Sequence, residues 1–202
     1  MSKLIVINNL TLDGVMQAPG RPEEDRRDGF AHGGWAVPYG DAVKGQAMGA
    51  GMAAGAAGAA ALLLGRRTYE DFASFWPEQV DNPFTAVLDA MRKYVVSTTL
   101  DDPLPWQNST LVDGDAATSV AALKRETEQD LVVLGSGELV RALAGADLVD
   151  EYVLMIHPLV LGAGRRLFDG TGPMAALELT DSLTSTTGVF IGTYRPVGRR
   201  VT

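Results

Sequence analysis

The sequence contains no cysteine. A disulfide, a thiolate metal site and a cysteine nucleophile are therefore excluded, and nothing argues for an oxidising compartment. Long apolar runs are also missing, because no segment approaches the roughly 20 residues that a membrane-spanning helix needs. The short apolar start at 4–7 runs into Asn8 and Asn9, unlike the core of a signal peptide. We therefore expect a cytoplasmic protein with no membrane partner.

Positive charge is scarce as well. The chain has 17 Lys and Arg against 25 Asp and Glu, which gives a net charge of −8. Such a surface repels a phosphate backbone, so we expect no nucleic-acid partner. A phosphorylated small molecule can still bind where a few basic side chains and helix N-termini gather. His32 and His157 are the only histidines and lack the spacing of metal ligands, so we expect no metal site.

The 202 residues are 46% apolar and 21% charged, which predicts one folded domain over 1–202. Short continuous apolar runs are typical of strands that helices cover on both faces. Segments with helical spacing of apolar residues and with capping signals lie between these runs. The alternation predicts a three-layer α/β/α fold with a mostly parallel sheet. The expected strands are 4–7, 61–64, 94–96, 131–134 and 152–156, and the expected helices are 68–75, 82–91, 117–129 and 138–144.

After about residue 150 the pattern changes. Segments 152–160, 177–183 and 189–194 look like strands without helices between them, so the C-terminal part should be antiparallel and complete a mixed sheet. Residues 17–40 are rich in Gly, Pro and charge and lack periodicity, which indicates an active-site loop or a mobile segment. Residues 45–61 alternate small residues, which favours a closely packed helix.

A first candidate site follows the expected strand at 61–64. The strand ends at Gly65 and opens directly into a helix start with Arg66, Arg67 and Thr68. Free N–H groups at the helix N-terminus, a hydroxyl and two guanidinium groups form a compact site for a phosphate. The alternative is an ordinary strand-to-helix turn with solvated arginines.

A second glycine-rich turn, at residues 135–139, follows the expected strand at 131–134. Its glycines let the backbone approach a ligand, although the full dinucleotide fingerprint is missing. A third expected strand ends in Ser97 and Thr98. Ligands of open α/β sheets bind beyond the carboxyl ends of the strands, so we expect all three strand ends to flank one dinucleotide. The residues of the second turn are Gly135, Ser136, Gly137, Glu138 and Leu139.

Together these motifs resemble the dihydrofolate-reductase-like superfamily. Residues 65–70 resemble its Gly-Arg-x-Thr-aromatic-Glu segment at the cofactor phosphates, and 97–98 its hydroxyl pair at the adenosine 2′-phosphate. Residues 135–137 are similar to its triple-glycine turn under the pyrophosphate. The segments 11–14 and 157–168 look most like the reductase domain of bifunctional riboflavin-biosynthesis enzymes. The resemblance runs in order from about residue 3 to 196 and so covers nearly the whole chain.

The resemblance implies an NADPH-dependent reductase of a small heterocyclic substrate, with the pyrimidine reductase of riboflavin biosynthesis as the nearest activity. It implies NADPH rather than NADH, with Arg66 contacting the extra phosphate beside Thr98, and it implies a homodimer. Glu138 departs from the pattern, since many dihydrofolate reductases carry a basic residue there. The partner deaminase domain needs cysteines for zinc, so we expect none within these residues. A folate, pterin or xenobiotic reductase, and a nucleotide-binding homologue without catalysis, remain as alternatives.

Dihydrofolate reductase also uses a buried carboxylate a few residues beyond a Trp-x-x-Pro segment. Trp35 to Asp41 has the same ingredients with one extra residue before the acid. Asp41 is therefore a candidate proton donor, a role that burial would support by raising its pKa; its alternative is a helix N-cap. Asp13 is a second candidate, and its alternative is a turn-forming Asp-Gly pair.

Overall fold

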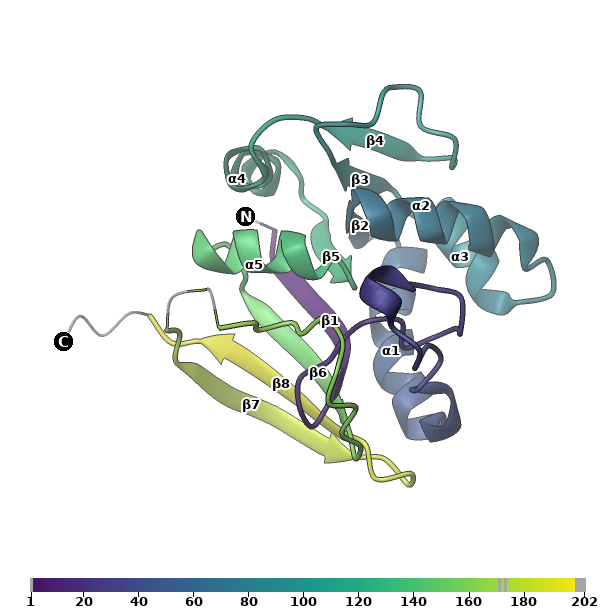
Figure 1. Ribbon diagram of the computed structural model, residues 1–202. Helices are drawn as coiled ribbons and strands as arrows, with labels where there is room; N and C mark the ends of the chain where they lie inside the picture. Colours follow the sequence, from purple (N-terminus) through teal and green to yellow (C-terminus); the bar gives the residue numbers. More distant parts are fainter. Residues whose placement is uncertain (1, 171, 173, 199–202) are drawn as a thin grey trace.

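The computed structural model describes residues 2–170, 172 and 174–198. Its eight strands form one sheet in the order β4-β3-β2-β5-β1-β6-β8-β7 (Figure 1). The strand bounds are β1 Leu4–Thr11, β2 Ala60–Gly65, β3 Lys93–Val96, β4 Ser109–Val112, β5 Asp130–Leu134, β6 Glu151–His157, β7 Leu177–Thr184 and β8 Phe190–Pro196.

The predicted mixed sheet is confirmed. From β4 to β6 every neighbouring pair is parallel, whereas β8 runs antiparallel to β6 and β7 antiparallel to β8. Strand β6 belongs to both parts, because it pairs with β1 on one side and with β8 on the other. It ends at His157 rather than at residue 160, since Pro158 has no N–H to donate to a ladder.

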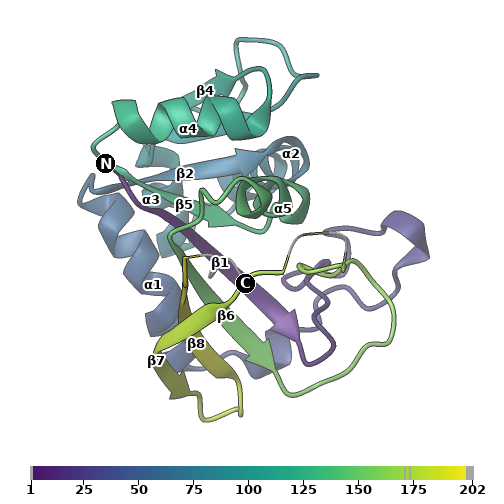
Figure 2. The same cartoon turned by 90° about the vertical axis from the view of Figure 1, so that its left-hand side faces the viewer.

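Helices cover both faces of the sheet. Leu4 and Val6 of β1 share one core cluster with α4 and α5, and the alternate residue Ile7 shares the other with α2 and α3. In Figure 2, α1 and α5 accordingly lie on opposite sides of β1. Burial on both faces is why the strands are continuously apolar. The helix bounds are α1 Ala42–Ala56, α2 Arg66–Phe75, α3 Pro83–Ala90, α4 Ala116–Glu126 and α5 Gly137–Gly145.

Two elements show how far the local sequence predicts secondary structure. Helix α1 confirms the small-residue helix, although it ends at Ala56 and not at residue 61. A Cβ on Gly55 would lie 2.3 Å from the Met91 sulfur, so a larger residue there would require the Met91 side chain to move. Strand β4 was not predicted, since its residues at the sheet edge are only partly buried and carry a weak apolar signal.

The parallel arrangement brings the carboxyl ends of β1, β2, β3 and β5 to the same edge of the sheet. The long connection 12–41, with the short helices η1 (Arg27–Gly29) and η2 (Val37–Tyr39), packs beside this edge (Figure 1). Among the residues that the structure describes, no helix is both long and apolar enough to span a membrane.

Candidate functional site

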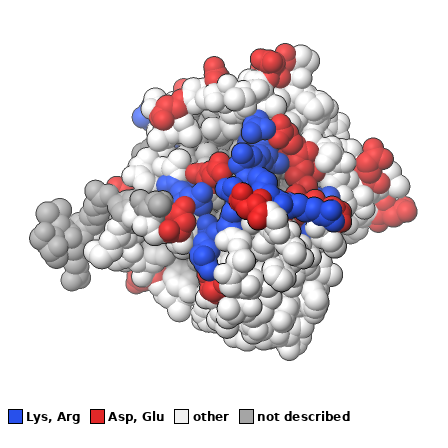
Figure 3. Space-filling view, in the orientation of Figure 1, with Lys and Arg blue, Asp and Glu red and all other residues white. Residues whose placement is uncertain are grey.

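A cleft of about 1310 Å³ opens at these strand ends. One side, the strand-end wall, consists of Gly65–Thr68, Ser97–Thr99 and Leu134–Leu139; the other, the loop wall, consists of the lining residues between 16 and 41 together with Arg165 and Arg166. All the predicted cofactor-binding residues line the cleft, and so does Asp41, whereas Asp13 does not. Lys and Arg side chains gather on this face of an otherwise acidic molecule (Figure 3).

The two glycine turns meet within the strand-end wall. The Gly65 N–H donates to Ser136 Oγ at 3.0 Å, and the Ser136 N–H donates to Thr68 Oγ1 at 3.1 Å. Gly135 has a φ of +63°, which favours glycine, and a Cβ there would lie 3.4 Å from the Thr68 methyl group. The predicted convergence of the two turns is confirmed, and it places the N-termini of α2 and α5 side by side at one cleft.

The side chains of the strand-end wall differ in their exposure and in the partners they already have. Arg66 is half-exposed and pairs with Glu70 one turn along α2 at 3.1 Å. Thr98 is exposed at the rim, whereas the Ser97 hydroxyl is buried and accepts the N–H of Leu100 at 3.1 Å. Leu139 belongs to the core, so only its backbone is available to a ligand.

Asp41 is a helix N-cap. Its Oδ1 accepts the Lys44 N–H at 2.8 Å, while Oδ2 accepts the N–H of Thr186 at 2.7 Å and that of Thr187 at 3.3 Å. The Lys44 hydrogen bond, followed by those from Thr186, lowers the pKa of Asp41 to about 2. The expectation that burial raises this pKa is therefore wrong, because the carboxylate is solvated and its charge is stabilised.

Asp13 ties the turn after β1 to the segment that follows β6. It accepts the Thr11 hydroxyl at 2.5 Å and the N–H groups of Leu161 at 3.2 Å and Gly162 at 2.9 Å. These bonds, with Thr11 foremost, lower the pKa of Asp13 to about 2. Asp13 thus stays ionised and outside the cleft, and the turn alternative describes it.

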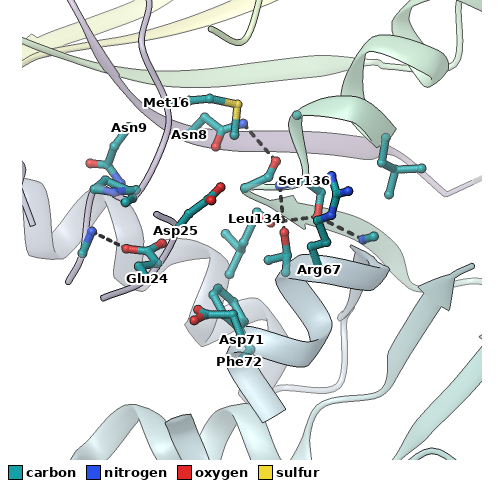
Figure 4. Close-up of a pocket in the computed structure, with 18 of the residues that line it drawn as sticks. Asn8, Asn9, Met16, Glu24, Asp25, Arg67, Asp71, Phe72, Leu134 and Ser136 are labelled. Atoms are coloured by element: carbon teal, nitrogen blue, oxygen red, sulfur yellow. Dashed lines mark hydrogen bonds between the residues drawn. The ribbon is translucent and has the colours of Figure 1, made fainter. Parts of the chain in front are cut away.

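Among the carboxyl groups that line the cleft and that sequence reasoning missed, Glu24 and Asp71 have raised pKa values (Figure 4). Glu24 accepts the N–H groups of Gly20 at 2.7 Å and Arg21 at 3.1 Å, and burial raises its pKa, with Asp71 adding to the effect. Burial also raises the pKa of Asp71, although Asp71 forms an ion pair with Arg21. No local motif marks either residue, because their desolvation arises only when the loop packs against α2.

The histidine beside the cleft is fully buried. His157 Nε2 lies 3.0 Å from Asn9 Oδ1, and the ring packs edge-on against Trp35 and Tyr39. Burial, with a contribution from Lys44, lowers the pKa of His157 to about 4. His157 is therefore neutral at pH 7 and packs as a core residue.

Solved structures share this fold. A putative riboflavin biosynthesis protein from Shewanella sp. PV-4 has a TM-score of 0.67 at 20% identity, covering 98% of this chain and 99% of that one. A diaminohydroxyphosphoribosylaminopyrimidine deaminase/5-amino-6-(5-phosphoribosylamino)uracil reductase from Thermotoga maritima has a TM-score of 0.61 at 15% identity, covering 97% of this chain and 57% of that one. Dihydrofolate reductase from Enterococcus faecalis, complexed with NADP(H), has a TM-score of 0.54 at 14% identity, covering 96% of both chains. The fold is therefore dihydrofolate-reductase-like.

A family match covers the cleft as well as the sheet. It extends over residues 2–191, from the start of β1 into β8. It includes both glycine turns and the whole loop wall, so it spans everything that forms the site. This protein belongs to the RibD C-terminal domain family.

Proposed function

We propose that this protein is an NADPH-dependent reductase of a small heterocyclic substrate, similar to the pyrimidine reductase of riboflavin biosynthesis. One observation carries the proposal: the turns at Gly65 and Gly135 are hydrogen-bonded to each other and present two helix N-termini to one cleft. The family and the NADP(H) complex of a protein with the same fold support it.

The residues of the strand-end wall fit a dinucleotide diphosphate. The first N–H groups of α2 and α5 have no partner within their helices, and a diphosphate can accept hydrogen bonds from them. Gly135 has a φ of +63°, which favours glycine, and because glycine has no side chain a ligand can come close to the backbone here. Arg66 and Thr98 stand at the rim, where they would contact a 2′-phosphate. When bound, the cofactor supplies the hydride, and the protein orients it and excludes water.

The reduction of a C=N or C=O bond also needs a proton, which Asp41 and Asp13 are poorly suited to supply because both stay ionised well below neutral pH. We assign this role instead to Glu24. It lines the cleft, its pKa is raised by burial, and two backbone N–H groups fix its orientation. Asp71 suits the role less well, because Arg21 stabilises its charge.

Titration with NADPH tests the cofactor assignment. Trp76 lines the cleft, so binding should quench tryptophan fluorescence. We expect saturation at micromolar NADPH; no binding at that level would contradict the proposal. Turnover is then measured with pterin, pyrimidine and flavin substrates. Turnover of a pterin alone would favour the folate-type alternative, and NADPH binding without any turnover would favour a homologue that has lost catalysis.

A further inference from the structure

Three arginines from separate segments converge on one carboxylate at the rim of the cleft. Glu138 Oε1 lies 3.0 Å from Arg67 Nη1, 3.4 Å from Arg165 Nη1 and 3.9 Å from Arg27 Nη1. Arg67 belongs to α2 in the strand-end wall, whereas Arg27 and Arg165 belong to the loop wall. We call these three residues the arginine cluster. It connects the two walls through a single acidic side chain.

Three carboxylates balance the three positive charges of the arginine cluster. Asp25 Oδ1 accepts the Arg27 Nε–H at 2.8 Å, and Asp28 Oδ2 accepts the Arg165 Nη2–H at 2.8 Å. Three guanidinium groups therefore face these two carboxylates and Glu138. If Glu138 turned away, two carboxylates would remain against three cations, and one positive charge would be uncompensated. That charge matches a single ionised phosphoryl group.

Two hydrogen-bond donors of the cluster are not satisfied by the residues that the structure describes. Arg27 Nη1 and Arg165 Nε are both buried and have no hydrogen-bond partner. Buried donors are usually paired, so two unsatisfied donors within the arginine cluster indicate that an acceptor-rich group belongs beside them. A phosphoryl group offers more acceptor oxygens than the one carboxylate oxygen that Glu138 directs at the cluster.

Glu138 is also placed where a bound phosphate would be stabilised. It lies in the first turn of α5, near the positive end of the helix dipole and its free N–H groups. Its side chain is 63% exposed, and exposed ion pairs are weak, so little opposes its rotation into solvent. Glu138 is thus an internal anion that a stronger one can replace.

We propose that Arg27, Arg67 and Arg165 form a phosphoryl-binding subsite from which the phosphate of a ligand displaces the Glu138 carboxylate. The inference rests on the proposed function in that the cleft receives phosphorylated ligands. The phosphoryl group belongs either to the diphosphate of the dinucleotide or to a phosphate ester of the second ligand. The chemistry of the subsite is the same for both.

Calorimetric titration with inorganic pyrophosphate at fixed ionic strength tests the subsite. Glu138→Gln keeps the shape of the side chain and removes its charge, and Glu178→Gln on β7, which is exposed and outside the cleft, changes the net charge equally. We expect Glu138→Gln to bind pyrophosphate roughly three- to tenfold more tightly than the control. If Glu138 only holds the loop wall in place, its substitution should leave binding equal or weaker, and either result would overturn the proposal.

A second substitution shows whether the gain depends on the arginine cluster. Adding Arg165→Ala to Glu138→Gln should abolish the gain, whereas adding Arg26→Ala, an exposed arginine outside the cleft, should preserve it. A gain that survives the loss of Arg165 would contradict the proposal. If Glu138→Gln does not fold, Arg165→Ala and Arg26→Ala are made singly in the unmodified chain. The proposal then requires that Arg165→Ala weakens pyrophosphate binding and that Arg26→Ala does not.

Saturating NADPH distinguishes the two sources of the phosphate. Competition between NADPH and pyrophosphate in Glu138→Gln supports the subsite and assigns it to the cofactor diphosphate. Simultaneous binding supports the subsite and assigns it to a phosphorylated second ligand. If no variant binds NADPH but Glu138→Gln still gains pyrophosphate affinity, the reductase proposal fails while the subsite stands.

Discussion

The two walls of the cleft are built in different ways. The strand-end wall stands on buried parallel strands, and two hydrogen bonds join its turns. The loop wall packs around a small apolar cluster of its own, and polar contacts join it to residues far away in the sequence. Gln17 Oε1 accepts the Arg165 N–H at 2.9 Å, and Trp35 Nε1–H donates to the Gln17 carbonyl at 2.7 Å. A ligand would therefore meet rigid backbone on one side and adjustable charged side chains on the other.

The contrast extends to the acids. Asp41 and Asp13 hold segments together through N–H groups that stabilise their charge, whereas Glu24 and Asp71 line the cleft, where burial disfavours their charge. The carboxyl groups with the clearest sequence context are structural. Glu24, to which we assign proton transfer, acquires its environment only when the loop wall folds.

The largest effect should come from damage to the rigid wall. Gly135→Val forces a β-branched residue to a φ of +63° and pushes its methyl groups against Thr68. We expect NADPH affinity to fall by about 100-fold or more, which corresponds to roughly 2.7 kcal/mol, as measured by fluorescence titration. Gly58→Val is the matched control, because Gly58 also has a positive φ of +72° but lies outside the cleft. An equal loss in both variants would contradict this account.

The next effect tests a side chain on the same wall. Arg66→Ala removes the proposed contact with the 2′-phosphate, and a hydrogen bond to a charged group is worth about 1.5–3 kcal/mol. NADPH should therefore bind roughly ten- to a hundredfold more weakly, while NADH affinity changes little. Arg195→Ala, which removes an exposed arginine of β8, should affect neither cofactor. An equal loss for both cofactors in Arg66→Ala would remove Arg66 from the proposed role.

A smaller effect should follow from loosening the loop wall. Asp13→Ala leaves the N–H groups of Leu161 and Gly162 without their acceptor. We expect the free energy of unfolding to fall by about 1–2 kcal/mol, seen as a drop in Tm of roughly 2–4 °C per kcal/mol. NADPH affinity should fall far less than in Gly135→Val. Asp181→Ala on the edge strand β7 is the control. A comparable loss of stability there would show that the hydrogen bonds of Asp13 to Leu161 and Gly162 do not account for the effect.

The smallest effect is a difference in titration between the two classes of acid. Asp41 and Asp13 have folded pKa values near 2, below their ordinary 3.8, so their contribution to stability is present above about pH 4 and is lost as the pH falls toward 2. Glu24 has a raised pKa, so its contribution is present below its ordinary pKa of 4.5 and is lost as the pH rises.

Carbon-13 NMR of the carboxyl groups checks this difference directly. The Asp41 and Asp13 carbons should still report carboxylate at pH 3, where the Glu24 carbon should report the acid. If Glu24 titrates together with Asp41, the two environments are equivalent and the assignment of proton transfer to Glu24 fails.

Much of the fold was predictable from local patterns. The apolar runs at 4–7 and 131–134 identified two neighbouring strands, since burial on both faces requires continuous hydrophobicity. Strand β4 escaped prediction because its residues lie at the sheet edge and are only partly buried. Asp41 illustrates the limit for the site. Its local sequence fits both a cap and a catalytic acid. The Lys44 N–H makes it a cap, and hydrogen bonds from Thr186, 145 residues away, contribute to the lowered pKa that makes it a poor proton donor.

The sequence by itself determined the mixed α/β sheet and the two glycine turns, because both depend on backbone preferences and burial patterns within a few residues. Only the tertiary structure decided which acids keep their charge and which arginines surround Glu138. Those properties depend on desolvation and on distances between Arg27, Arg67 and Arg165, which folding brings together from three distant segments.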